Sequence, residues 1–155
     1  MKNDINKIQL TNKEAQELIN ELKKRANNEL LDFPTRGNKI EFEVCGIKKS
    51  NDKYIINITR SNINDEKCNY QGRVERSNIP LMRLDITDGS HRNPDGKKIV
   101  GNHLHIYNEN YELSYAIPFD VEREDLFGYC MEFFKKFNLV ADENNFNIIY
   151  QIGIN

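Results

Sequence analysis

The three histidines of the chain, His91, His103 and His105, fall within one short stretch. Imidazole changes its protonation near neutral pH, so histidine serves as a general acid or base and, when neutral, as a metal ligand. Because successive side chains of a β-strand point to opposite faces, His103 and His105 would share one face with Cα atoms about 7 Å apart. The spacing therefore indicates a single site on one strand.

An arginine and an aspartate with the same spacing precede the histidines. Arg83 and Asp85 would share one face of an earlier strand, and pairing of the two strands would bring them beside His103 and His105. The loop between the strands carries His91 and the sequence Asn-Pro-Asp-Gly, which is typical of a tight turn. Such a turn would hold His91 over the sheet.

This set of residues suits acid–base chemistry on a phosphodiester without a metal. The histidines would transfer protons, and Arg83 or the pair Lys97-Lys98 would neutralise the phosphate. We predict catalytic roles for His91, His103, His105 and Tyr107, and substrate-binding roles for Arg83, Asp85, Asn93 and Lys97. No metal and no other cofactor is predicted.

Three other interpretations remain open. Three neutral imidazoles could bind a transition metal with Asp85 as a fourth or outer group, although a bare His-x-His is a weak sign of a metal site. The set could instead recognise an acidic partner or a nucleic acid end without any reaction. In the simplest case, the histidines are ordinary polar residues on a half-exposed sheet face beside a well-formed loop.

The same segment carries two resemblances. His-Leu-His-Ile-Tyr resembles part of the histidine-triad nucleotide hydrolase signature, but Tyr107 stands in place of the third histidine, so the nucleophile of that family is not carried over. A wider pattern is similar to that of a family of small uncharacterised proteins of bacteria and their phages or mobile elements. This pattern runs Arg83-x-Asp85, His91-x-Asn93-Pro94-Asp95-Gly96, His103-x-His105-x-Tyr107 and Ala116-x-Pro118. It implies a mobile-element context and no established activity.

Length and composition indicate one domain with a real core. The chain has 155 residues, of which 38% are hydrophobic and 30% are charged. We expect residues 1–155 to form this single domain, with residues 1–10 as a candidate for disorder. A net charge of -2 does not suggest nonspecific coating of nucleic acid. The three cysteines lack a C-x-x-C pair and are expected to be buried free thiols.

No apolar run reaches the roughly 18 residues that indicate a membrane span, and the N-terminus lacks the apolar core of a signal peptide. We therefore expect a cytoplasmic protein with no membrane partner.

Two helices are predicted. A capping box from Thr11 to Glu14 starts the first, and apolar residues then recur at helical spacing as far as Ala26, before Pro34. Asp120 would cap the second, which runs to about Asn138 with one aromatic stripe. This stripe comprises Leu126, Phe127, Cys130, Phe133, Phe134 and Phe137.

Between and after these helices, the two-residue alternation of apolar side chains predicts strands. The expected strands are 40–44 and 54–58 as a hairpin, 68–76, 79–87, 103–107 paired with 111–117, and 146–154. Residues 88–102 are expected to form a loop.

Together these patterns predict an α+β domain with a mostly antiparallel sheet and both helices on one face, leaving the opposite face to the histidines. The predicted function is metal-independent acid–base chemistry on RNA or a nucleotide, as in a ribonuclease or a nucleotide phosphodiesterase. The alternative is a non-catalytic, phage-borne inhibitor that binds a host defence protein, of the CRISPR type or a similar one.

Overall fold

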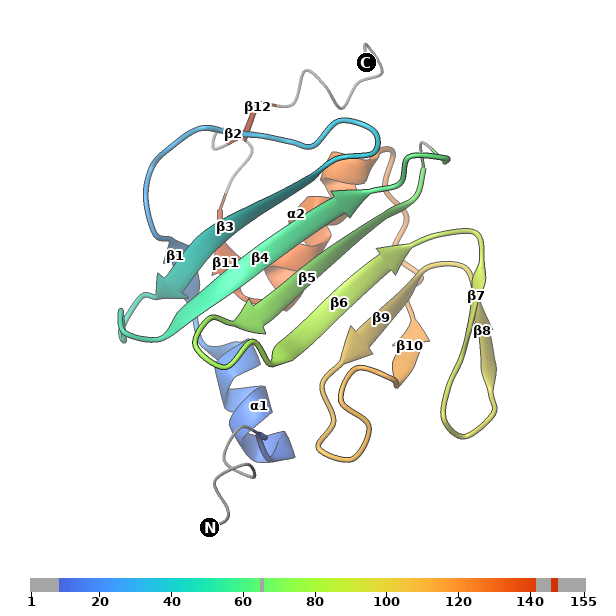
Figure 1. Ribbon diagram of the computed structural model, residues 1–155, viewed down its shortest axis with the longest axis horizontal. Helices are drawn as coiled ribbons and strands as arrows, with labels where there is room; N and C mark the ends of the chain where they lie inside the picture. The colour runs from blue at the N-terminus through green and yellow to red at the C-terminus, as the bar shows by residue number, and fades with distance from the viewer. Residues whose placement is uncertain (1–8, 65, 142–145, 148–155) are drawn as a thin grey trace.

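The fold is α+β, as predicted. A computed structural model describes residues 9–64, 66–141 and 146–147, and its main feature is an eight-stranded sheet (Figure 1). Four consecutive strands form the centre of this sheet, each antiparallel to the next: β3 (Lys39–Gly46), β4 (Lys53–Arg60), β5 (Cys68–Val74) and β6 (Pro80–Ile86). These strands match the predicted ones because their apolar alternation is regular.

Shorter strands extend the sheet on both sides. On one side lie β9 (His103–Ile106) and β10 (Ala116–Pro118), and on the other lie β1 (Lys23–Arg25) and β11 (Leu139–Val140). The full order is β10-β9-β6-β5-β4-β3-β1-β11. Only β1 and β11 pair in parallel among these described strands, so the sheet is mostly antiparallel.

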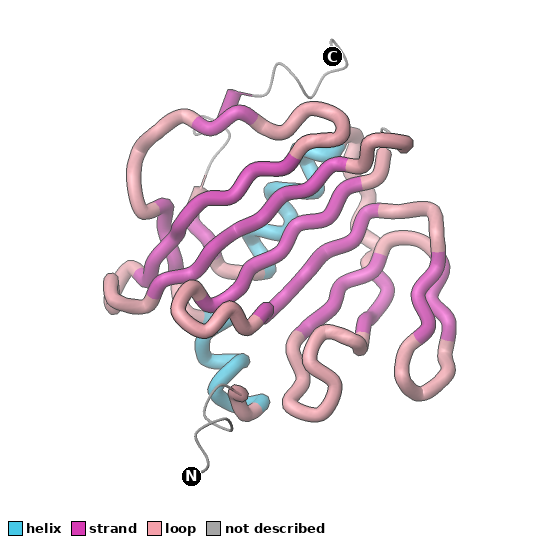
Figure 2. The backbone as a smooth tube through the Cα atoms, in the orientation of Figure 1, coloured by secondary structure: helices cyan, strands magenta, loops and turns pink. Residues whose placement is uncertain are grey.

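Two small pairs of strands lie outside the main sheet. β2 (Leu31–Asp32) pairs with β12 (Phe146–Asn147) in parallel, and β7 (Ser90–Arg92) pairs with β8 (Lys98–Val100) as an antiparallel hairpin. Figure 2 shows this hairpin standing beside β9 and β10.

The C-terminal helix α2 (Leu126–Lys136) covers one face of the sheet, where its aromatic stripe enters the core. Tyr70 of β5 stacks on Phe133, and its hydroxyl donates a hydrogen bond to the Leu126 carbonyl. Gly72 lies so close to Phe137 that a Cβ at this position would lie 2.6 Å from the ring. The aromatic stripe is therefore core, as predicted.

The first helix is shorter than predicted. α1 (Asn12–Asn20) begins at the capping box of Thr11, but Glu21 is extended and a strand follows. Lys23 is completely buried, and its ammonium donates hydrogen bonds to the carbonyls of Ile19 and Phe137 at 2.9 and 2.8 Å. Leu22, one of the apolar residues at helical spacing before Ala26, is more than half exposed. Pairing with β3 and β11 thus overrides the helical periodicity after Asn20.

Three other boundaries differ from the prediction. The second helix is capped by Asp125 rather than Asp120, because the Asp125 carboxylate accepts a hydrogen bond from the Gly128 amide. The predicted loop 88–102 contains the β7–β8 hairpin, and the predicted strand 111–117 is reduced to β10. Of the predicted last strand, only residues 146–147 are described. The sequence Asp-Glu-Asn-Asn at residues 142–145 predicts a polar turn, and this segment lies outside the described residues.

The remaining expectations concern cysteines and membranes. Cys45, Cys68 and Cys130 are free and buried, as predicted. Within the described part of the chain, neither helix is long and apolar enough to cross a membrane.

Candidate functional site

The register between β6 and β9 brings the predicted residues together. Arg83 lies opposite His105, and Asp85 lies opposite His103. The alternate residues of β6 and β9, such as Leu84, are buried in the hydrophobic core, so the charged set occupies the other face of the sheet. The predicted shared face of these two strands is confirmed.

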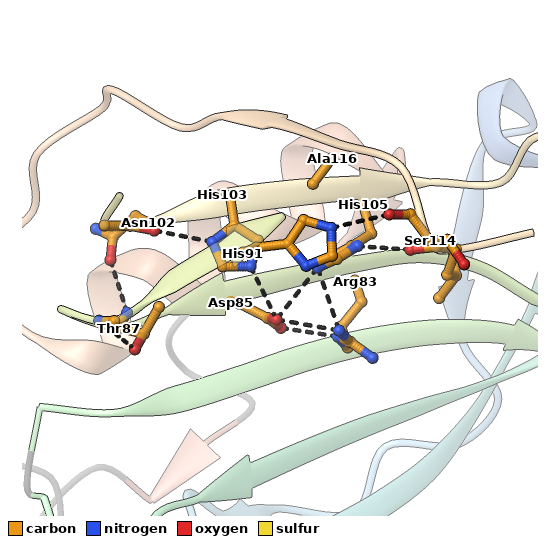
Figure 3. Close-up of polar contacts among 12 residues, drawn as sticks. Arg83, Asp85, Thr87, His91, Asn102, His103, His105, Ser114 and Ala116 are labelled. Atoms are coloured by element: carbon orange, nitrogen blue, oxygen red, sulfur yellow. Dashed lines mark hydrogen bonds and ion pairs between the residues drawn. The ribbon is translucent and has the colours of Figure 1, made fainter. Parts of the chain in front are cut away.

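The β7–β8 hairpin carries His91 over this face. The side chain of Asn93, only 6% exposed, forms two hydrogen bonds with the main chain of Ala116, one donated at 2.9 Å and one accepted at 2.8 Å. The ring of His91 then stacks on that of His103 with centroids 5.3 Å apart, and meets His105 edge-on at 4.8 Å. Figure 3 shows the three rings side by side, with Asp85 facing them.

One nitrogen of each imidazole is bonded to a main-chain carbonyl. Nε2 of His91 lies 2.8 Å from the Ser114 oxygen, Nδ1 of His103 lies 2.8 Å from Gly101, and Nδ1 of His105 lies 2.6 Å from Leu113. Because a carbonyl only accepts hydrogen bonds, each of these nitrogens carries a proton. The other nitrogen of each ring is therefore not bonded to the main chain.

The remaining nitrogens of the two buried histidines have different partners. Nε2 of both His103 and His105 lies 3.3 Å from one oxygen of Asp85, and Nη2 of Arg83 lies 3.2 Å from Nε2 of His105. Since a guanidinium only donates, neutral His105 can accept its hydrogen bond from Arg83, while protonated His103 donates to Asp85. Arg83 also donates to both Asp85 oxygens, so in this assignment no two donors face each other, and the three side chains of Arg83, Asp85 and His103 carry one net positive charge.

Two pKa values follow from these contacts. Burial alone would raise the pKa of Asp85, but the hydrogen bonds from His103 and Arg83, together with the positive charge of Arg83, outweigh it and hold that pKa well below its ordinary value. The hydrogen bond to Asp85 raises the pKa of His103, and the opposing effect of burial is smaller. The pair therefore favours an aspartate anion beside an imidazolium.

A cavity of about 450 Å³ opens beside the cluster. Asp85, His91 and His103 form part of its wall. The rest of the wall includes polar residues at the ends of β4, β5 and β6, together with the first residue of β7, namely Thr59, Ser61, Lys67, Asn69, Thr87 and Ser90. His105 does not line the cavity and is only 1% exposed. His91 is thus the histidine most accessible to a ligand.

Comparison with known protein families gives a match that includes the whole site. A model of a family of unknown function, DUF6978, matches residues 10–139. The chain belongs to this family. No curated protein and no solved structure matches the chain.

Three of the residues predicted from sequence lie apart from the cluster of this DUF6978 chain. Tyr107 is buried, and its hydroxyl bonds to the main chain of Leu10 as both donor and acceptor. Lys97 is exposed in the turn between β7 and β8. Asn93 acts on the hairpin through Ala116 rather than facing the cavity.

Sequence reasoning missed the polar row that leads into the cavity. Strand register aligns Thr59, Asn69, Asp85 and His103 across β4, β5, β6 and β9. The two-residue period alone puts each of these residues on a solvent face, but only the register between strands makes them neighbours. The alternation along each strand could have identified each residue, but nothing in the sequence indicated that the four residues align across the sheet.

The cluster could also hold a metal ion. One ligand nitrogen from each of His91, His103 and His105 lies within 4.8 Å of the other two. Each ring is fixed by a carbonyl on its opposite side, which is how metal-binding histidines are commonly oriented.

Proposed function

We propose that this DUF6978 chain binds a phosphodiester of RNA or of a nucleotide in the cavity, and that His91 acts on it as a metal-independent general base. The observation that carries the proposal is the contact of the three imidazoles with one another beside the cavity, where His91 and His103 form part of the wall and have unlike hydrogen-bond states. His103 donates to Asp85, whereas Nδ1 of His91 has no hydrogen-bond partner among the described residues.

His91 suits the role of base because its orientation is already set. Its Nε2 donates to Ser114, so a proton can be accepted only at Nδ1, and the ring is held by stacking on His103. His103 and His105 act as positioning residues, since they are buried beneath His91.

The charge of the cluster suits a phosphate. The positive charges of Arg83 and protonated His103 outnumber the negative charge of Asp85 by one, and Lys67 adds another positive charge at the cavity wall. Hydroxyl and amide groups lining the cavity offer donors to the remaining phosphate oxygens.

In RNA, His91 would accept the proton of a 2′-hydroxyl as its oxygen attacks phosphorus. The new bond from phosphorus to the 2′-oxygen forms as the bond to the 5′-oxygen breaks. The leaving 5′-oxygen takes a proton from a water molecule, and the hydroxide so formed takes the proton held by His91, which restores both the water and the neutral base. The products are a 2′,3′-cyclic phosphate and a 5′-hydroxyl, with no oxidant or metal required.

The test is cleavage of a single-stranded RNA, labelled at both ends, by protein freed of metal and assayed with a chelator. His91→Ala should lower kcat by about 10²-fold or more, and the double change His103→Ala with His105→Ala should abolish cleavage. Lys67→Ala should raise KM by roughly twofold to fivefold, as expected for one exposed charge pair, whereas Lys49→Ala, an exposed lysine of the β3–β4 turn, should not.

Cleavage that disappears with the chelator and returns with a metal would contradict the metal-independent mechanism. A wild-type protein that neither cleaves nor binds RNA or nucleotides would sink the proposal and favour the inhibitor of a host defence protein instead.

A further inference from the structure

We propose that the three histidines bind a divalent transition metal ion, of the Zn²⁺ type, which blocks His91 and so switches the site off reversibly. The metal site rests on the geometry of the cluster alone. Its inhibitory effect rests on the proposed function.

The three imidazole rings are oriented in the way that metal-binding histidines commonly are. In each ring, one nitrogen is hydrogen-bonded to a main-chain carbonyl, so Nδ1 of His91 and Nε2 of His103 and His105 are the nitrogens available as metal ligands. Ligand nitrogens lie within 4.8 Å of one another, whereas zinc–nitrogen bonds of 2.0–2.1 Å in a tetrahedral site put them about 3.4 Å apart. Closing the cluster therefore requires at most about 1.4 Å of movement between any two nitrogens.

The Asp85 carboxylate lies near the fourth coordination position of the metal. The Asp85 oxygen that lies 3.3 Å from Nε2 of both His103 and His105 can coordinate the ion or hold a metal-bound water. Three imidazoles and one carboxylate favour Zn²⁺, Co²⁺, Ni²⁺ or Cu²⁺ over Mg²⁺ and Ca²⁺, which prefer all-oxygen sites.

Metal binding and the resting hydrogen bonds exclude each other. His103 must give up the proton that it shares with Asp85, and Arg83 must leave Nε2 of His105. One third of the Arg83 side chain is exposed, so it can turn towards solvent. Coordination uses the lone pair on Nδ1 of His91 that would otherwise accept a proton. While the ion is bound, His91 therefore cannot act as a base.

The experiment is a titration of metal-free protein with Co²⁺, whose visible absorption reports four-coordinate binding. We expect one ion per chain, displaced by Zn²⁺ and not by Mg²⁺. Since the chain has only three histidines, each single change to alanine should remove a ligand and weaken binding at least about tenfold. Cys68→Ser is the matched control, because this thiol also lines the cavity but should not coordinate.

Arg83→Gln separates loss of the site from loss of the fold. Removing the guanidinium should tighten Co²⁺ binding by about tenfold or more, because a positive charge no longer competes for His105. A misfolded protein cannot show tighter binding.

Absence of the four-coordinate spectrum, or a sulfur-to-cobalt charge-transfer band, overturns the metal site and leaves the proposed RNA chemistry standing. Binding of Zn²⁺ with RNA cleavage unchanged or increased overturns the inhibitory role. Binding of Co²⁺ by a protein that cleaves no RNA supports the metal site and counts against the proposed function alone.

Discussion

Asp85 is the residue on which the state of the cluster depends. It accepts hydrogen bonds from Arg83 and His103 and is the one carboxylate, among the described residues, in contact with the imidazoles. Its negative charge allows a guanidinium and an imidazolium to lie side by side in a partly buried place.

Asp85→Asn should disturb the cluster more than a change of similar size elsewhere. Without the carboxylate, His103 loses the hydrogen bond that raises its pKa, so this pKa should fall. The unpaired charge of Arg83 should lower the free energy of unfolding by roughly 1 to 3 kcal/mol.

NMR titration of the imidazoles with a chelator present measures the first effect, and urea unfolding measures the second. Asp120→Asn, an exposed aspartate, is the control. An unchanged His103 titration in Asp85→Asn would show that the two side chains are not paired in solution.

The β7–β8 hairpin is the element that completes the site. Its tip turn, Asn93 to Gly96, folds as sequence chemistry predicts, but its position over β9 depends on the two hydrogen bonds between Asn93 and Ala116. Tyr115 adds a second tie through its hydrogen bond to Asp95. The hairpin can therefore be loosened without touching a histidine.

Asn93→Ala should free the hairpin and displace His91. Two buried main-chain groups of Ala116 lose their partners, so we expect a loss of about 1 to 2 kcal/mol in unfolding free energy. Hydrogen exchange of the amides in residues 90–100 should accelerate by more than the loss of unfolding free energy accounts for, while the amides of β4 and β5 should accelerate no more than that loss requires.

Asn110→Ala, on the exposed loop before β10, should change neither measurement. Protection of residues 90–100 that is equal in Asn93→Ala and wild type would mean that other contacts hold the hairpin.

At the scale of the whole molecule, the polar site and the contacts that hold the N-terminal helix lie on opposite sides of the sheet. The polar site lies at the β6–β9 side, while Lys23 joins α1, β1 and the end of α2 at the other side through carbonyls of Ile19, Glu21 and Phe137. The Lys23 ammonium also lies 4.1 Å from the centroid of the Phe137 ring. This lysine secures the N-terminal helix to the core.

The stability of the molecule should depend on pH through Lys23. Burial lowers its pKa from 10.5 to about 7, and the nearby Glu21 carboxylate only partly opposes this shift. Between pH 7 and 10.5 the unfolded chain holds the proton that the folded chain has lost, so the unfolding free energy rises with pH across this window.

Lys23→Met should remove this dependence and leave three carbonyls without a donor, at a cost of about 1 to 3 kcal/mol near neutral pH. Urea unfolding of both proteins across the window checks the slope, with the exposed neighbour Lys24→Met as the control. Parallel stability curves for wild type and Lys23→Met would refute the shifted pKa.

Local patterns in the sequence predicted what depends on local forces. The capping box at Thr11, the central strands and the aromatic stripe of α2 follow from hydrogen bonding and apolar periodicity within a few residues. The same periodicity failed at Lys23, since only pairing with β3 and β11 makes a strand there. Tyr107 was predicted at the site by its spacing, yet its hydroxyl binds Leu10, far away in sequence.

The sequence by itself determined which residues could share a face: Arg83 with Asp85, and His103 with His105. Only the tertiary structure decided that these faces coincide, that His91 lies over them, and that Thr59 and Asn69 continue the row. The reason is that side-chain direction along a strand is a local property, whereas the register between strands is set by the packing of the whole sheet.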